Sequence, residues 1–324
     1  MKKININQFV KKKNNSKIIF TAGPSSLLVE NITGLGPCFG RGDKNYENLE
    51  KRVLNNIRKI SGHNKIVRFQ GSGSLALEIM SKNFLNGKVL VISTGYYSDR
   101  IFNLCKEIKE IRSLKKIDWK KIDQINENYD WIWACSTETS CGLKIPIEKL
   151  KKLSKKCNSK LMLDATGSIG LENKHYLADV ISFSSCKGLF GLTGASFICY
   201  NKEPKNKISS FYLNLFNHLN KKMTGPYHTI LSLDDVLKKH SHFKQSVIEN
   251  KKKFLKDMRK FISMPYEYQP LLCTYVDCKV ITGNKKVILY KPRNDLKGSV
   301  VCHLGEVHLG KSSKGNIQKN LKII

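Results

Sequence analysis

The stretch DVISFSSCKGLFGLTGASFICY, residues 179–200, combines two apolar runs with a glycine-rich turn between them. Short apolar runs bounded by glycine predict buried strands, here over 179–184 and 195–200. Lys187 lies directly after the first strand, among small and apolar residues. A lysine there either reaches out to solvent or serves as a desolvated nucleophile, and the neighbouring strand ends decide between the two.

Further apolar runs upstream predict strands over 65–70, 88–93, 131–135 and 160–164. Segments with apolar residues at helical spacing lie between them, over 74–85, 98–111 and 146–157. This alternation predicts an α/β fold with a mainly parallel sheet flanked by helices. In such a sheet a ligand binds outside the carboxyl ends of the strands, so the residues after each strand carry the functional interest.

The rest of the chain has a less regular pattern. Residues 1–17 form a basic N-terminal segment, and we expect a large domain over 18–229. A helical stretch over 230–262 and several short strands after it predict a small C-terminal α+β domain over 230–324.

The composition limits the partners. The formal net charge is +31, but lysines are spread along the chain with asparagine and isoleucine, as an AT-rich genome produces. Lysines and aromatic residues are not grouped, so we expect no nucleic-acid binding. Apolar runs are shorter than a membrane span needs, and the start of the chain lacks a signal-peptide core, so we expect a cytoplasmic protein without a membrane partner.

The ten cysteines are scattered, with no CxxC pair and no cysteine–histidine cluster at zinc-ligand spacing. We therefore expect no metal site, and we interpret the cysteines as small core residues kept reduced.

Three polar features stand at successive strand ends. Ser72, Gly73 and Ser74 open a helix after the strand 65–70, where backbone N–H groups can cradle a phosphate, although serine is also an ordinary helix cap. Asp164 closes the strand 160–164, either as a turn cap or as a partner for a cationic group, and Lys187 follows the next strand. Together they match the phosphate, the pyridinium nitrogen and the aldehyde of pyridoxal 5′-phosphate.

The chain resembles the class V family of fold type I pyridoxal-phosphate enzymes, most closely the 2-aminoethylphosphonate–pyruvate aminotransferases. Collinear motifs carry this resemblance: FTAGPSS (20–26), QGSGSLALE (70–78), STGYYSDR (93–100), STETSCGL (136–143), LMLDATGSIG (161–170), SSCKGLFGLTGASF (184–197) and MTGPYHT (223–229). The fold that it implies is that of the fold type I transferases, with a small C-terminal α+β domain.

The resemblance also implies catalytic roles. Lys187 would bind the cofactor aldehyde covalently and then move the substrate proton, and Asp164 would keep the ring nitrogen protonated. Tyr97 would stack on the ring, although core packing is the ordinary role of a tyrosine, and Thr139 would lie near the 3′-hydroxyl.

Phosphate binding would fall to Ser72, Gly73 and Ser74, with Thr224 reaching the phosphate from a partner subunit. The resemblance therefore implies a homodimer with shared active sites.

The substrate anchor departs from the family pattern. The family has an arginine before an IGD-like motif, and the matching stretch SVVCHLGEV (299–307) puts Val300 at that position. Valine cannot bind an anion. Arg293 and Arg41 are the candidates to bind the acid end of the substrate, and a solvated surface arginine is the alternative reading of each.

We therefore expect an aminotransferase that moves an amino group between a small amine, 2-aminoethylphosphonate first, and a 2-oxo acid such as pyruvate. An alanine– or serine–glyoxylate aminotransferase is an alternative. A second alternative is a catalytically silent, basic member of the fold that binds a macromolecular partner.

Overall fold

The computed structural model describes residues 5–14, 16–305, 307 and 321–324. Part of the expected N-terminal segment (residues 1–4 and 15) and Glu306 of the 299–307 stretch lie outside the described residues. Residues Ile6–Asn14 of that segment form helix α1.

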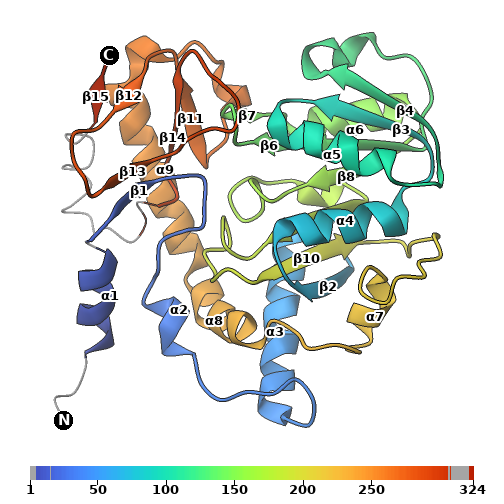
Figure 1. Cartoon of the computed structure of the whole chain (residues 1–324), viewed down its shortest axis with the longest axis horizontal. Helices are drawn as coiled ribbons and strands as arrows, with labels where there is room; N and C mark the ends of the chain where they lie inside the picture. The colour runs from blue at the N-terminus through green and yellow to red at the C-terminus, as the bar shows by residue number, and fades with distance from the viewer. Residues whose placement is uncertain (1–4, 15, 306, 308–320) are drawn as a thin grey trace.

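The largest sheet within the described residues has seven strands in the order β2-β10-β9-β8-β5-β3-β4 (Figure 1). Its strands are β2 (Lys65–Gln70), β3 (Gly87–Ser93), β4 (Ile111–Asp118), β5 (Trp131–Cys135), β8 (Lys160–Asp164), β9 (Val180–Ser184) and β10 (Ala195–Tyr200). Neighbours run parallel, except that β10 is antiparallel to both β2 and β9. The predicted α/β fold with a mainly parallel sheet is confirmed.

Helices cover both faces of this sheet because its strands are apolar on both sides. Leu161 and Leu163 face one apolar cluster, whereas Met162 between them faces the other. The first cluster includes residues of α3 (Lys44–Ser61), α6 (Ile147–Lys156) and α8 (Tyr227–Lys238). The second includes residues of α4 (Gly73–Phe84), α5 (Tyr96–Lys106) and α7 (Leu215–Leu219).

Two predicted helices differ from the structure. The helix expected over 98–111 ends at Lys106, and Ile111 already begins β4. The stretch expected as one helix over 230–262 is divided at Lys239 into α8 and α9 (His240–Asp257). Apolar spacing misses the first break because β4 exposes its polar residues and lacks a continuous apolar run. It misses the second because the apolar spacing continues across Lys239.

Short elements connect the sheet and helices. They are α2 (Glu30–Thr33), the hairpin strands β6 (Thr137–Glu138) and β7 (Leu143–Lys144), and the 3-10 turns η1 (Trp119–Gln124), η2 (His175–Leu177), η3 (Arg259–Phe261) and η4 (Tyr266–Tyr268).

The C-terminal region is built from two-stranded pairings. Its strands are β11 (Cys273–Val276), β12 (Val280–Ile281), β13 (Val287–Leu289), β14 (Ser299–Cys302) and β15 (Lys322–Ile323). β11 pairs with β14 and β12 with β15, whereas β13 pairs in parallel with β1 (Ile18–Phe20) from the start of the chain (Figure 1). The expected division at residue 229 stays a prediction, and we propose that residues 18–20 belong with the small domain.

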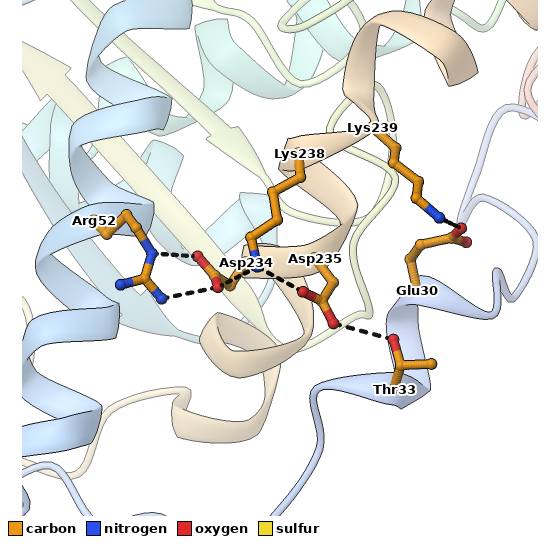
Figure 2. A network of polar contacts seen from close by, with 7 residues as sticks. All are labelled: Glu30, Thr33, Arg52, Asp234, Asp235, Lys238 and Lys239. Carbon is orange, nitrogen blue, oxygen red and sulfur yellow. Dashed lines mark hydrogen bonds and ion pairs between the residues drawn. The ribbon is translucent and has the colours of Figure 1, made fainter.

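Helix α8 is tied to its neighbours by charged side chains (Figure 2). Arg52 of α3 donates two hydrogen bonds of 2.9 Å to Asp234 of α8, and Thr33 of α2 donates one of 3.1 Å to Asp235. Burial raises the pKa of Asp234, but the bonds from Arg52 and Lys238 outweigh it and lower that pKa. This network fixes the helix that begins directly after the MTGP segment (223–226).

Candidate active site

A cavity of about 370 Å³ lies at the carboxyl ends of the strands of the large sheet. The expected cofactor residues that line it are Ser72, Gly73, Ser74, Tyr97, Thr139, Asp164 and Lys187. They come from five separate segments, and the parallel order of β5, β8 and β9 brings them to the carboxyl ends of the strands.

Lys187 is half-buried in the loop between β9 and β10. Its carbonyl accepts a hydrogen bond of 2.8 Å from the Phe190 N–H, and the Ser25 N–H donates one of 2.8 Å to the neighbouring Cys186. Gly23 packs on the lysine stem at a φ of +136°, and a Cβ there would lie 2.9 Å from Lys187 Cγ. The start of the chain thus confines the lysine, whose Nζ lies 5.8 Å from the centre of the Tyr97 ring.

Asp164 lies at the end of β8 with 4% of its surface exposed. The Thr166 N–H donates a hydrogen bond of 2.9 Å to its Oδ1. Burial, followed by the charge of Asp164, raises the pKa of the adjacent Cys135 thiol well above its ordinary value. The carboxylate therefore lies on the cavity wall, next to a thiol that stays protonated.

The start of α4 forms another wall. Ser72 is the N-cap residue, its side chain makes no cap hydrogen bond, and the N–H groups of the first turn follow it. Gly73 keeps this wall open, because a Cβ there would lie 3.2 Å from the Thr166 hydroxyl. Free donors at the N-terminus of a twelve-residue helix suit an anion such as a phosphate.

Glu138 is a functional residue that the sequence did not indicate. It is fully buried, and its Oε2 accepts hydrogen bonds from the Tyr97 N–H (3.0 Å) and the Ser98 N–H (3.2 Å) at the start of α5. Ser140 bonds the other oxygen. Burial raises the pKa of Glu138 in spite of these bonds. Glu138 thus holds the backbone that carries Tyr97.

Several hydroxyls on the cavity wall are without partners. Thr137, Thr139 and Thr166 each have a buried Oγ1 that makes no hydrogen bond within the described part of the chain. Buried hydroxyls normally find a partner, so this wall is built for a polar ligand. Pyridoxal phosphate fits it, with a phosphate for the start of α4, a ring nitrogen for Asp164 and an aldehyde for Lys187.

Three predicted residues do not line the cavity. Arg41 and Thr224 are exposed in loops outside it. Arg293 is also exposed, but its guanidinium lies 5.3 Å from the Tyr96 ring centre and Nη1 donates to Tyr96 Oη at 3.4 Å. Val300, at the position of the family arginine, is 3% exposed and packs in an apolar cluster.

The cavity also contains residues that were not predicted. Arg100 lies one turn after Tyr97 on α5, and Thr166 lies two residues after Asp164. Helical spacing from Tyr97 could have indicated Arg100.

Neither a metal site nor a membrane span emerges from the described residues. They contain no group of three or more histidine, cysteine, aspartate or glutamate side chains that could hold a metal ion. Among the described helices, none has the length and apolar character that a bilayer span requires.

The fold and this cavity define a fold type I pyridoxal-phosphate enzyme. A family model described as aminotransferase class-V matches residues 40–214. The match covers more than half of the chain, and the chain therefore belongs to the class V aminotransferase family. Its cofactor is pyridoxal 5′-phosphate.

Curated relatives are similar at low identity. A bifunctional phosphonoacetaldehyde hydrolase/aminoethylphosphonate transaminase from Clostridioides difficile is 26% identical over 60% of this chain, which spans 33% of that protein. A 2-aminoethylphosphonate–pyruvate transaminase from Klebsiella pneumoniae is 23% identical over 82% of this chain and 81% of its own length.

Solved structures share the fold. An alanine–glyoxylate aminotransferase from Nostoc sp. matches with a TM-score of 0.77 and 17% identity, covering 92% of both chains. A phosphoserine aminotransferase from Cytophaga hutchinsonii matches with a TM-score of 0.80 and 17% identity, covering 94% of this chain and 98% of its own.

Proposed function

We propose that this chain transfers an amino group between a small primary amine and a 2-oxo acid. The observation that carries the proposal is the meeting of Lys187, Asp164 and the start of α4 in one cavity. When bound, pyridoxal phosphate supplies an electron sink for the substrate carbon. Lys187 Nζ would hold the cofactor and would move the proton of the substrate carbon that bears nitrogen, while Asp164 would keep a proton on the ring nitrogen.

The first candidate for the amino donor is 2-aminoethylphosphonate, with pyruvate as acceptor. Support comes from relatives that bear this name, at 23–26% identity. Because Val300 cannot bind an anion, we propose that Arg293 meets the phosphonate. Its guanidinium lies over the ring of Tyr96, and Tyr96 contacts Tyr97, which lines the cavity. Alanine or serine is the alternative donor, with glyoxylate as acceptor.

We further propose a homodimer in which Thr224 reaches the phosphate of the partner subunit. Thr224 is exposed and does not line the cavity of its own chain. Its loop is nevertheless held in place, since Lys221 and Arg68 both bond the buried carboxylate of Glu50 and Gly225 packs on the Arg68 guanidinium.

The test begins with the visible absorbance band of lysine-bound cofactor. The purified protein should show this band after incubation with pyridoxal phosphate, and Lys187→Ala should lose it. Lys160→Ala is the matched control, because Lys160 begins β8 at the end opposite Asp164. A wild type that takes up no cofactor would contradict the enzyme proposal.

The same band identifies the donor. Candidate amines are added one at a time, and the true donor should bleach the band as the amino group passes to the cofactor. Bleaching by alanine or serine but not by 2-aminoethylphosphonate would reject the first donor and keep the reaction class. If no amine bleaches the band of the loaded protein, the aminotransferase proposal fails.

A further inference from the structure

The turn that carries Lys187 is held by donors from three distant parts of the chain. Three of its carbonyls accept a hydrogen bond from outside the turn: Cys186 from the Ser25 N–H (2.8 Å), Gly188 from His240 Nε2 (2.8 Å) and Phe190 from Asn31 Nδ2 (2.9 Å). Two of these acceptors directly flank Lys187. The backbone on both sides of the lysine is therefore fixed by segments that lie far from it in the chain.

This turn has a backbone conformation that is unfavourable by itself. Phe190 has a φ of +56°, in the left-handed region that bulky side chains avoid, and its ring is fully buried. Gly188 lies so close to the preceding loop that a Cβ on it would come within 2.1 Å of the Ile169 oxygen. Such a conformation persists only where the surrounding structure over-determines it. The donors from outside the turn are therefore needed to keep its shape.

His240 is the side-chain donor that acts nearest to Lys187, because its acceptor belongs to the residue that follows the lysine. A carbonyl oxygen only accepts, so Nε2 carries the proton. Burial lowers the pKa of His240, so the ring is neutral at neutral pH and Nε2–H is its single N–H donor. The ring also packs on Phe190, with the two ring centres 5.5 Å apart. Both the packing and the donor of His240 thus serve the same turn.

The break between α8 and α9 places His240 against this turn. His240 is the first residue of α9 and follows Lys239, whose Nζ donates a hydrogen bond of 2.9 Å to Glu30 on α2 (Figure 2). Further along α9, Phe243 and Val247 pack in an apolar cluster with residues of β11 and β14. The helix is therefore anchored on both sides of His240, and it connects the turn to the C-terminal region.

We propose that His240 is a positioning residue for Lys187: its Nε2–H holds the Gly188 carbonyl so that the lysine amine meets the cofactor aldehyde. The proposal rests on the role proposed above for Lys187. His240 does not line the cavity and acts only through the backbone of the turn. When the cofactor is loaded, the unprotonated amine bonds the aldehyde carbon and one water molecule leaves. The rate of this step depends steeply on the placement of the two reacting atoms.

The experiment separates binding of the cofactor from its bond to Lys187. Pyridoxine 5′-phosphate has the ring and the phosphate of pyridoxal phosphate but an alcohol in place of the aldehyde, so it binds without reacting with the lysine. His240→Leu should bind it with wild-type affinity in calorimetry. At saturating pyridoxal phosphate, however, the visible band of lysine-bound cofactor should form about tenfold more slowly in this variant than in the wild type.

The matched control is His242→Leu, which changes an exposed histidine two residues further along α9 and should alter neither measurement. Parallel losses of band formation and of pyridoxine phosphate affinity in His240→Leu would indicate general damage to the site and overturn the proposal. An unchanged rate of band formation would overturn it as well.

A conservative replacement provides the second criterion. His240→Gln keeps an N–H donor that can reach the Gly188 carbonyl, so it should restore the rate of band formation to within about twofold of the wild type. Packing alone would not distinguish His240→Gln from His240→Leu, because both lack the ring that packs on Phe190. An equal loss of rate in the two variants would therefore contradict the positioning role.

If His240→Leu does not fold, His240→Asn takes its place, because its amide is one carbon shorter than that of His240→Gln and stops short of Gly188. Equal rates in these two variants would overturn the proposal. Failure of the proposed function has a separate sign: the visible band would persist in Lys187→Ala, or no amine would bleach it, whatever the His240 variants do.

Discussion

Asp164 shows how one residue acquires its role from the backbone around it. The carboxylate closes a buried strand, keeps only 4% exposure and accepts the Thr166 N–H. A cationic ring nitrogen in the cavity would give this buried acidic side chain a charged partner.

Asp164→Asn is therefore expected to keep the cofactor and lose turnover. The visible band should remain, while the amine half-reaction should slow by about a hundredfold or more, because a neutral amide does not hold a proton on the ring nitrogen. Stopped-flow absorbance measures this rate. Asp179→Asn is the control. Asp179 lies just before β9, at the amino ends of the strands, and accepts a hydrogen bond from the Leu161 N–H. An unchanged rate in Asp164→Asn would refute the role.

At this scale the sequence indicates residues that follow a strand but not residues that arrive from elsewhere. Lys187 and Asp164 stand at strand ends, so the parallel sheet alone brings them together. Arg293 reaches the Tyr96 ring from the C-terminal region, and no local pattern predicts that contact. The role of Glu138 was not predicted for a related reason: the N–H groups that it binds lie about forty residues earlier in the chain.

Helix α5 is the element whose position depends most clearly on one side chain. Its first N–H groups point to Glu138, so the carboxylate acts as an anion at a helix N-terminus as well as a hydrogen-bond acceptor. Movement of this end would move Tyr97 and Arg100 on the cavity wall.

Glu138→Gln is expected to loosen the start of α5. The amide replaces one acceptor oxygen with a donor that faces backbone N–H groups, so pyridoxal phosphate should bind about tenfold more weakly and the melting temperature should fall by a few degrees. Cofactor titration and calorimetry measure the two effects. Glu107→Gln at the exposed C-cap of the same helix should change neither. Equal cofactor affinity in wild type and Glu138→Gln would contradict this positioning role.

The sequence predicts elements well where they are buried and poorly where they are not. Strands β2, β5 and β8 have the predicted bounds, because each is a short apolar run covered on both faces. Strand β4 was not predicted because none of its residues is fully buried and its polar residues are exposed, whereas the other edge strand, β2, is buried over 67–69. The break at Lys239 was not predicted because apolar spacing continues across it.

At the scale of the whole molecule, the proposed dimer makes each active site depend on two chains. Lys187 lines the cavity of its own chain, while Thr224 is exposed beyond it. In the proposed two-fold dimer, the Thr224 loop of each subunit would lie against the active site of the other.

Mixing Lys187→Ala with Thr224→Ala tests this arrangement. After subunit exchange, a mixed dimer has one site with both substitutions and one with neither, so activity should rise above that of either variant, toward about a quarter of wild type. Differently tagged subunits report the exchange. Exchange without any gain in activity would show that Thr224 does not act across the interface.

The pairing of β1 with β13 has a consequence for the order in which the molecule can form. The two strands lie side by side (Figure 1), but about 270 residues separate Ile18 from Val287 along the chain. A ribosome needs roughly 15 to 50 s to make that length, so β1 emerges long before its partner exists. The strands of the central sheet, all within residues 65–200, can pair on the nascent chain during this interval. The pairing of β1, by contrast, must wait until Val287–Leu289 has been made.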